Sequence, residues 1–260
     1  MRAISIGKIG ENLVNEDAAI ANDRMIAVSD GAGGGGVFAD LWSKYLVEHL
    51  PDVSITDYQA FDAWVDGIWE PFYNDCEKKA QQEGGMILNK FYEEGSFATL
   101  VIVWNDGHWI SYGDSVAFCY NRNTGRLQHT FGRIVDFNNP PYLVNCKDPS
   151  DEKGFKCGRF KMNGDSIVFA CSDALAHYIL MMYEVTHQDK YQDELQEAVN
   201  AQTKDSNFIK TAMGLKKVDF EKDVIGKLLN CKNAGNFRRH LECLRKKGLI
   251  AHDDYSLVMM

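Results

Sequence analysis

An apolar segment that ends in an acidic residue and a run of glycines is the part of the chain best suited to chemistry. It covers residues 25–36 and reads MIAVSDGAGGGG, so that Asp30 is followed by five glycines in six positions. The apolar residues predict a buried strand, and the glycines permit a positive φ and let a ligand approach the main chain closely. The Asp30 carboxylate and the Gly31 carbonyl are oxygen donors of the kind that a hard divalent cation prefers.

Two other interpretations of this segment stay open. A phosphate-binding loop is disfavoured because there is no Gly-Lys-Ser/Thr ending and no GxGxxG in a βαβ context. Asp30 would also repel phosphate unless a metal lay between them. The other interpretation is an ordinary Asp-Gly turn, and this segment alone supports it about as well as it supports a cation site. The rest of the chain has to decide.

Further acids stand where predicted strands begin or end. They are Glu16 and Asp17, Asp114, Asp173, and Asp253 with Asp254. By itself the segment 15–20 fits a solvated turn better than a strand edge. Asp114 is different, because an aspartate inside a β-rich region is locally unfavourable, so something other than strand propensity should fix it there. If these strand ends converge, the carboxylates cannot all ionise without cations. Because no His/Cys spacing accompanies them, we expect all-oxygen sites for Mg²⁺ or Mn²⁺ rather than structural Zn²⁺.

Periodicity predicts the elements that must position these acids. We expect helices at 37–50, stopped by Pro51, and at 58–83, where Pro71 should kink or split the helix. The remaining expectations are strands at 3–6, 25–28, 97–104, 108–112 and 116–120, a loop at 137–164, a strand before Ser172, mostly helix at 175–247, and a terminal strand.

Composition limits the compartment and the partners. The 260 residues carry 28 Lys and Arg against 37 Asp and Glu, a formal charge of −9, which argues against a nucleic-acid or anionic-membrane partner. The seven cysteines are odd in number and lack CxxC spacing, so we expect them to be reduced and buried. No apolar run reaches the ~20 residues that cross a bilayer. We therefore expect an unprocessed, cytoplasmic monomer.

The acidic segments and their neighbours form an ordered set of motifs. In chain order these are Asn-Glu-Asp (15–17), Ser-Asp-Gly-x-Gly-Gly (29–34), Gly-Ser-x-Ala-Thr (95–99), Gly-Asp-Ser (113–115), Ser-Asp-Ala (172–174) and Asp-Asp-x-Ser (253–256). Each motif alone is weak. Together, in this order and at these spacings, they resemble the PP2C-type (PPM) family of metal-dependent serine/threonine protein phosphatases over residues 4–260.

The resemblance implies an α+β fold, a four-layer α-β-β-α sandwich of two antiparallel sheets flanked by helices, with residues 1–260 as a single phosphatase domain. It also implies roles for particular residues. Asp30 would bridge two Mn²⁺ or Mg²⁺ ions. Gly31 (through its carbonyl) and Glu16 would complete one site, and Asp173 and Asp253 would hold the other ion. Asp17 would hydrogen-bond metal-bound water, and Asp114 with His177 would hold a weaker third ion. The implied reaction is hydrolysis of a phosphomonoester by a metal-bridging water.

This chain departs from the family at four positions. Asn12 stands where the family has a phosphate-binding arginine, so that Lys8 or Arg2 would have to substitute. Ala174 replaces a glycine, a mild change if its φ is negative. His177 replaces an acid that assists the third ion, and Val116 replaces an arginine. None of these changes removes a core metal ligand.

Three functions therefore stay open. The first is an active hydrolase, a phosphoserine/phosphothreonine protein phosphatase acting on phosphorylated proteins. The second is a catalytically weak or silent relative that binds a partner, suggested by the missing arginine. The third is a phosphomonoesterase for small metabolites. Retention of every core acid favours an enzyme, because a silent protein has no reason to keep mutually repelling carboxylates together.

Overall fold

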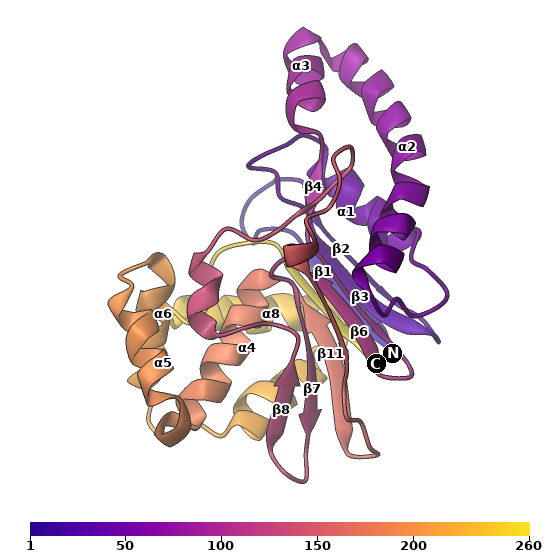
Figure 1. The fold of residues 1–260 in the computed structure, drawn as a ribbon. Coiled ribbons are helices and arrows are strands. Elements are labelled where there is room, and N and C mark those ends of the chain that lie inside the picture. Colours follow the sequence, from indigo (N-terminus) through magenta and orange to yellow (C-terminus); the bar gives the residue numbers. More distant parts are fainter.

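Two five-stranded antiparallel sheets pack face to face in the computed structural model, which describes residues 1–260 (Figure 1). Sheet A has the order β1 (Arg2–Ile6), β12 (Tyr255–Met259), β11 (Ser166–Cys171), β7 (Val116–Asn121), β8 (Arg126–His129). Sheet B has the order β10 (Phe155–Arg159), β6 (His108–Tyr112), β5 (Leu100–Trp104), β3 (Met25–Asp30), β2 (Asp17–Ala21). A small third sheet pairs β4 (Phe97–Ala98) with β9 (Val144–Asn145).

Helices cover the outer face of each sheet. Sheet B carries α1 (Ala39–Glu48), α2 (Tyr58–Glu83) and α3 (Gly85–Glu94), and Figure 1 shows α2 and α3 rising beyond the sheet. Sheet A carries α4 (Asp173–Thr186), α5 (Gln188–Asn200), α6 (Lys204–Met213), α7 (Gly226–Asn230) and α8 (Ala234–Lys246). Three short helical segments complete the chain: η1 (Ile134–Asn138) after β8, η2 (Glu152–Gly154) before β10, and η3 (Glu221–Ile225) between α6 and α7. The predicted four-layer α-β-β-α sandwich is confirmed.

The apolar sequence of β3 follows from burial on both of its faces. Ile26 and Val28 pack between the two sheets, while Met25 and Ala27 pack against the layer of α1 to α3. All four side chains are at most 2% exposed. A strand between two packed layers needs no polar alternation. Asp30 at its end is the first residue of this strand that is not fully buried.

Several expectations about local structure need correction. The segment at residue 17 is a strand rather than a solvated turn, and α2 runs unbroken through Pro71. The predicted loop at 137–164 contains β10, whose backbone pairs with β6 over five residues. The polar sequence of β10 does not predict a strand, because an edge strand needs little apolar surface. All seven cysteines are free as expected, but Cys157 and Cys243 are exposed. None of the helices is long and apolar enough to cross a membrane.

Candidate metal centre

The β2–β3 pair brings two of the predicted acids together. Asp17 lies opposite Asp30 in the antiparallel register, and the Gly31 N–H donates to the Glu16 carbonyl at 3.1 Å. Asp17 is only 6% exposed, and neither of its carboxylate oxygens has a hydrogen-bond partner. A buried carboxylate without partners is costly, which makes Asp17 the polar group of this region most in need of a ligand.

Three of the five glycines after Asp30, namely Gly31, Gly33 and Gly36, are required by space rather than by backbone angle. None of the five has a positive φ, so the loop does not use the left-handed conformation that glycine permits. A Cβ on Gly31 would lie 2.6 Å from the Ala39 carbonyl oxygen and 2.7 Å from that of Glu16. A Cβ on Gly33 would overlap the Glu16 carboxylate itself. The loop thus wraps closely around Glu16 and holds its side chain at this edge.

Buried hydroxyl groups fix the end of β3. The Ser29 hydroxyl donates to the Thr99 carbonyl at 2.7 Å, and the Asp30 N–H donates to Thr99 Oγ1 at 3.2 Å. Thr99 Oγ1 in turn lies 2.7 Å from Ser115 Oγ. These contacts explain two of the sequence motifs, since Thr99 ends Gly-Ser-x-Ala-Thr and Ser115 ends Gly-Asp-Ser. Sequence reasoning noted the motifs but assigned these hydroxyls no role.

Asp173 reaches the same edge from a different element. Strand β11 ends at Cys171, Ser172 is the N-cap position, and Asp173 is the first residue of α4. Its Oδ1 accepts the Ala174 N–H at 2.5 Å, and a carboxylate in the first turn of a helix is stabilised by the helix dipole. Ala174 is helical with a negative φ, so this position has no need of the family's glycine.

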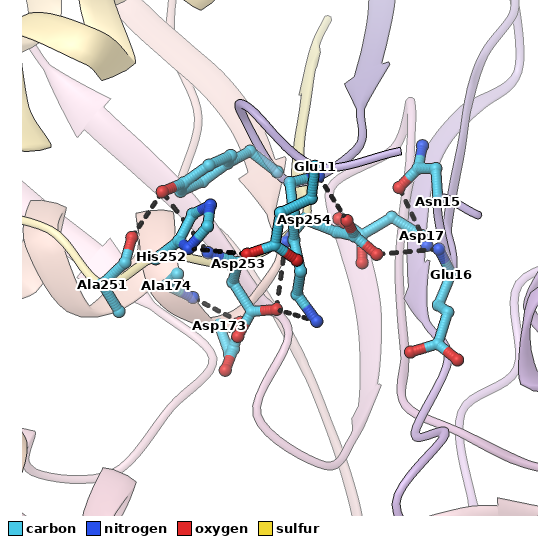
Figure 2. A network of polar contacts seen from close by, with 12 residues as sticks. Glu11, Asn15, Glu16, Asp17, Asp173, Ala174, Ala251, His252, Asp253 and Asp254 are labelled. Atoms are coloured by element: carbon cyan, nitrogen blue, oxygen red, sulfur yellow. Dashed lines mark hydrogen bonds and ion pairs between the residues drawn. The ribbon is translucent and has the colours of Figure 1, made fainter. Parts of the chain in front are cut away.

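The two consecutive acids before β12 have different surroundings. Asp254 is 5% exposed, and its two oxygens accept the backbone N–H groups of Lys8 and Glu16, both at 2.8 Å (Figure 2). Asp253 is partly exposed and forms an ion pair with Lys8 Nζ at 3.3 Å. Asp254 is therefore a structural brace between the N-terminal segment and β12, whereas Asp253 remains available as a ligand.

The acids influence one another's ionisation, which shows that they converge. Burial and then the charges of Asp17, Asp173, Asp114 and Asp253 raise the pKa of Asp30 well above its usual range. Burial raises the pKa of Asp17 to about 7 and that of Asp114 to about 6. For Asp173 the cause is again burial, followed by the charges of Asp114, Asp253 and Asp17, which raise its pKa strongly. Without added positive charge, this edge resists ionisation.

Glu16 adds a further carboxylate to this edge. Burial raises its pKa, the charge of Lys8 lowers it, and Asp254 and Asp40 raise it again. Asp40, in the first turn of α1, is an acid near the edge that the sequence did not single out. Nothing in its local pattern marks it, because an acid in the first turn of a helix is ordinary.

Cations near the site were predicted to be Lys8 or Arg2, and only Lys8 is there. Arg2 lies opposite Met259, at the far end of β1 from the acids, and donates to the Leu228 carbonyl at 2.8 Å. Asn12 lies in an exposed stretch of the loop before β2. Of these two cations, Lys8 is therefore the one that lies beside Asp253.

His177 is the one predicted site residue that the structure places apart from the acids. Its ring packs edge-on against Phe137, with ring centroids 5.3 Å apart, and against Phe208 at 6.4 Å. Burial lowers its pKa, and its Nε2 has no hydrogen-bond partner. No hydrogen bond or ion pair joins it to the carboxylates described above.

A divalent cation fits this edge by chemistry. No three His, Cys, Asp or Glu side chains are grouped closely enough, as they stand, to hold an ion. The edge nevertheless gathers oxygen donors from β2, β3, the β6–β7 turn, α4 and the segment before β12. The unpartnered Asp17 oxygens and the raised pKa values of its neighbours both call for positive charge. Such all-oxygen donor sets suit Mg²⁺ or Mn²⁺.

Solved structures share the whole architecture. The Mycobacterium tuberculosis serine/threonine phosphatase PstP/Ppp is 17% identical to this chain and gives a TM-score of 0.54. The match covers 99% of this chain and 96% of the phosphatase chain. The catalytic domain of PstP in complex with two manganese ions matches at 17% identity, 99% and 95% coverage and a TM-score of 0.52. The PPM Ser-Thr phosphatase MsPP from Mycobacterium smegmatis, in complex with cacodylate, matches at 13% identity, 99% and 96% coverage and a TM-score of 0.52.

The sequence itself matches no family model and no curated protein. The structural matches establish the fold, which is that of the PPM-type serine/threonine phosphatases, and they confirm at this level the resemblance found in the sequence motifs.

Proposed function

We propose that the protein is a metal-dependent phosphoserine/phosphothreonine protein phosphatase and that residues 1–260 form one phosphatase domain. The observation that carries the proposal is the unpartnered Asp17 carboxylate, held opposite Asp30 at an edge where acids from separate elements raise one another's pKa values. The shared fold supports it, because phosphatases of this architecture include one solved with two manganese ions.

The proposed metal ligands are those that the motifs indicate. Asp30 would serve both ions. Glu16 and the Gly31 carbonyl would complete one site, and Asp173 and Asp253 the other. Asp114 would contribute to a weaker third site, and a part for His177 there stays a prediction of the sequence motifs. The chemistry that bound Mn²⁺ or Mg²⁺ supplies is neutralisation of phosphate charge and the generation of a nucleophile from water at neutral pH.

The chain's own residues would orient the reactants. The two free oxygens of Asp17 can accept hydrogen bonds from a water molecule and hold it in one orientation. Lys8 Nζ, beside Asp253, can donate to a phosphate oxygen. A cysteine nucleophile is disfavoured, because burial and the charge of Asp173 raise the pKa of Cys171, the thiol nearest these acids, well above its usual range.

The test is phosphate release from a phosphothreonine peptide, an aryl phosphate and a sugar phosphate, each with Mn²⁺ and with EDTA. We expect release that requires the metal and is highest relative to KM for the peptide. Preference for the sugar phosphate would instead support the metabolite phosphatase. No release from any substrate with Mn²⁺, by a protein that binds Mn²⁺, would support the silent binding protein. Full activity of metal-stripped protein would contradict all of the metal assignments.

A further inference from the structure

A second candidate site lies in the helical layer over sheet A. A cavity of about 410 Å³ opens between α4, α7, α8 and the segment that joins α6 to η3. Its volume is in the range of small-molecule sites. None of the carboxylates proposed to bind metal lines it. We call it the lysine pocket, after the four lysines that surround it: Lys216, Lys217, Lys227 and Lys247.

The charge of the lysine pocket is opposite to that of the protein. The chain carries a net charge of −9, yet none of these four lysines forms an ion pair with a carboxylate; the lysines that do are Lys8, Lys44, Lys78, Lys90 and Lys147. The one acid that lines the pocket, Asp223, is already engaged, since its Oδ2 accepts the Asp219 N–H at 3.0 Å. Unpaired positive charge gathered at a cavity favours an anionic ligand.

A histidine in the pocket lacks a partner. His240 lines the cavity, and its Nε2 is buried without a hydrogen bond. Burial and then the charges of Lys227 and Lys247 lower the pKa of His240 to about 4, so the imidazole is neutral at pH 7. In its Nε2–H tautomer it can donate to an anion, which would satisfy the buried nitrogen.

The floor of the pocket is apolar. Tyr178, Met182, Leu244 and Leu249 line it and are each less than 5% exposed. Leu215, which is 39% exposed, stands at the rim. Bare inorganic phosphate would leave this surface unfilled, whereas a ring attached to the phosphate would cover it and gain the free energy of apolar burial.

We propose that the lysine pocket binds an aromatic organic phosphate, with the phosphate held by the lysines and His240 and the ring on the floor formed by Tyr178 and Met182. The site is independent of the proposed phosphatase reaction, because its residues and the metal-binding carboxylates do not overlap.

Calorimetric titration with three probes tests separately the proposed phosphate contact and the proposed ring contact. The probes are adenosine 5′-monophosphate, inorganic phosphate and adenosine, added to the wild-type protein in EDTA so that the acidic edge contributes no metal-dependent binding. We expect the monophosphate to bind at least about tenfold more tightly than phosphate or adenosine, because it alone has both a charge and a ring. Equal affinity for all three, or no binding of the monophosphate at 10 mM, would overturn the proposal.

Matched variants locate the binding. Lys227→Gln with Lys247→Gln removes two pocket charges, and Lys44→Gln with Lys90→Gln removes two lysine charges from α1 and α3. All four side chains are exposed or partly exposed, so both double variants should melt as the parent does. The pocket variant should lose at least about tenfold in monophosphate affinity, and the control should change by less than about twofold. The ligand should also shift the NMR signals of the His240 ring. Equal loss in both variants, or an unmoved His240 signal, contradicts the assignment.

Discussion

Asp17 and Glu184 are both buried carboxylates with an unpartnered oxygen, and they stand in very different surroundings. Asp17 is 6% exposed on β2, and Glu184 is 2% exposed on α4. Burial raises both pKa values, to about 7 and about 8. Asp17, however, has acids from other elements beside it, whereas the one charge that acts on Glu184 is that of Glu194.

This difference distinguishes a candidate metal site from an isolated buried carboxylate that only lowers the stability of the fold. An isolated buried carboxylate can remain neutral by binding a proton, and then it needs no cation. A group of carboxylates from several strand ends can instead share cations, and this lowers the free energy of all of them together.

The largest expected effect is on turnover. Asp30→Asn should lower kcat with Mn²⁺ by at least about 10³-fold, equivalent to about 4 kcal/mol of transition-state stabilisation, because Asp30 is the carboxylate proposed to serve both ions. Glu184→Gln should leave kcat within about twofold, although it also changes a buried carboxylate. The measurement is peptide dephosphorylation at saturating Mn²⁺. Comparable losses in both variants would mean that Asp30 matters for packing and not for metal binding.

The second-largest expected effect is on thermal stability, and its sign should depend on whether metal is bound. In EDTA, Asp30→Asn should melt at or above the temperature of the wild type, since it relieves repulsion among the acids. With Mn²⁺ at a hundredfold excess over Kd, the wild type should gain about 2.7 kcal/mol and the variant much less. Thermal melting of both proteins under the two conditions measures this. If Asp30→Asn unfolds the EDTA-treated protein, Asp30 is a structural turn residue.

Glu184 should produce a pH-dependent stability that a metal does not change. Its folded pKa, about 8, is above the ordinary 4.5, so the folded state keeps a proton that the unfolded state loses as pH rises from 4.5 to 8. Stability is therefore fully present below pH 4.5 and falls with rising pH, by about 3 kcal/mol at pH 7.

Glu184→Gln tests this directly. The variant should be more stable than wild type at pH 8 by about 2 kcal/mol, because the unsatisfied amide offsets part of the gain. At pH 4.5 the variant should instead be less stable than wild type by about 2 kcal/mol, because the cost of the unsatisfied amide remains and Glu184 is then protonated in the folded wild type. Urea unfolding of both across this range, with EDTA and with Mn²⁺, provides the comparison. A wild-type advantage at pH 8 would show that the folded protein stabilises the ionised form.

The fold, and the gathering of most of the predicted acids at one edge, could be predicted from the sequence for physical reasons that particular residues illustrate. The run before Asp30 is apolar because β3 is buried on both faces, and glycine is required at positions 31 and 33 because Glu16 lies against Gly31 and Gly33. Such constraints act over neighbouring positions and leave a local pattern. The order of the motifs then indicated the sandwich that the structural matches confirm.

Residues whose role depends on long-range contacts could not be predicted in this way. Thr99, just before β5, and Ser115, just before β7, brace Asp30, and Asp254 braces Lys8 and Glu16 from the other end of the chain. Nothing in the local sequence distinguishes Asp254 from Asp253. The polar edge strand β10 was missed because its pairing with β6, and not its own composition, defines it.

The smallest expected effect concerns Lys8, the cation that the acidic edge has and that Glu184 lacks. Lys8→Gln should raise KM for a phosphothreonine peptide by about 5- to 10-fold, close to 1 kcal/mol, with kcat changed by less than about twofold. Solvent screening limits the effect, because the Lys8 side chain is 28% exposed and its partner Asp253 41%. The same substitution frees Asp253 from its ion pair, so Mn²⁺ should bind at least as tightly as in wild type.

Opposite changes in phosphate and metal affinity would distinguish loss of a phosphate contact from general damage to the site. Asn12→Arg supplies the complementary test, since it introduces a cation at the position where the PP2C-type phosphatases that the sequence motifs resemble carry an arginine. It should lower KM in the Lys8→Gln background and change KM of the wild type less, because Lys8 already contributes there. If Asn12→Arg lowers KM equally in both backgrounds, the two positions act independently, and Lys8 does not substitute for the missing arginine.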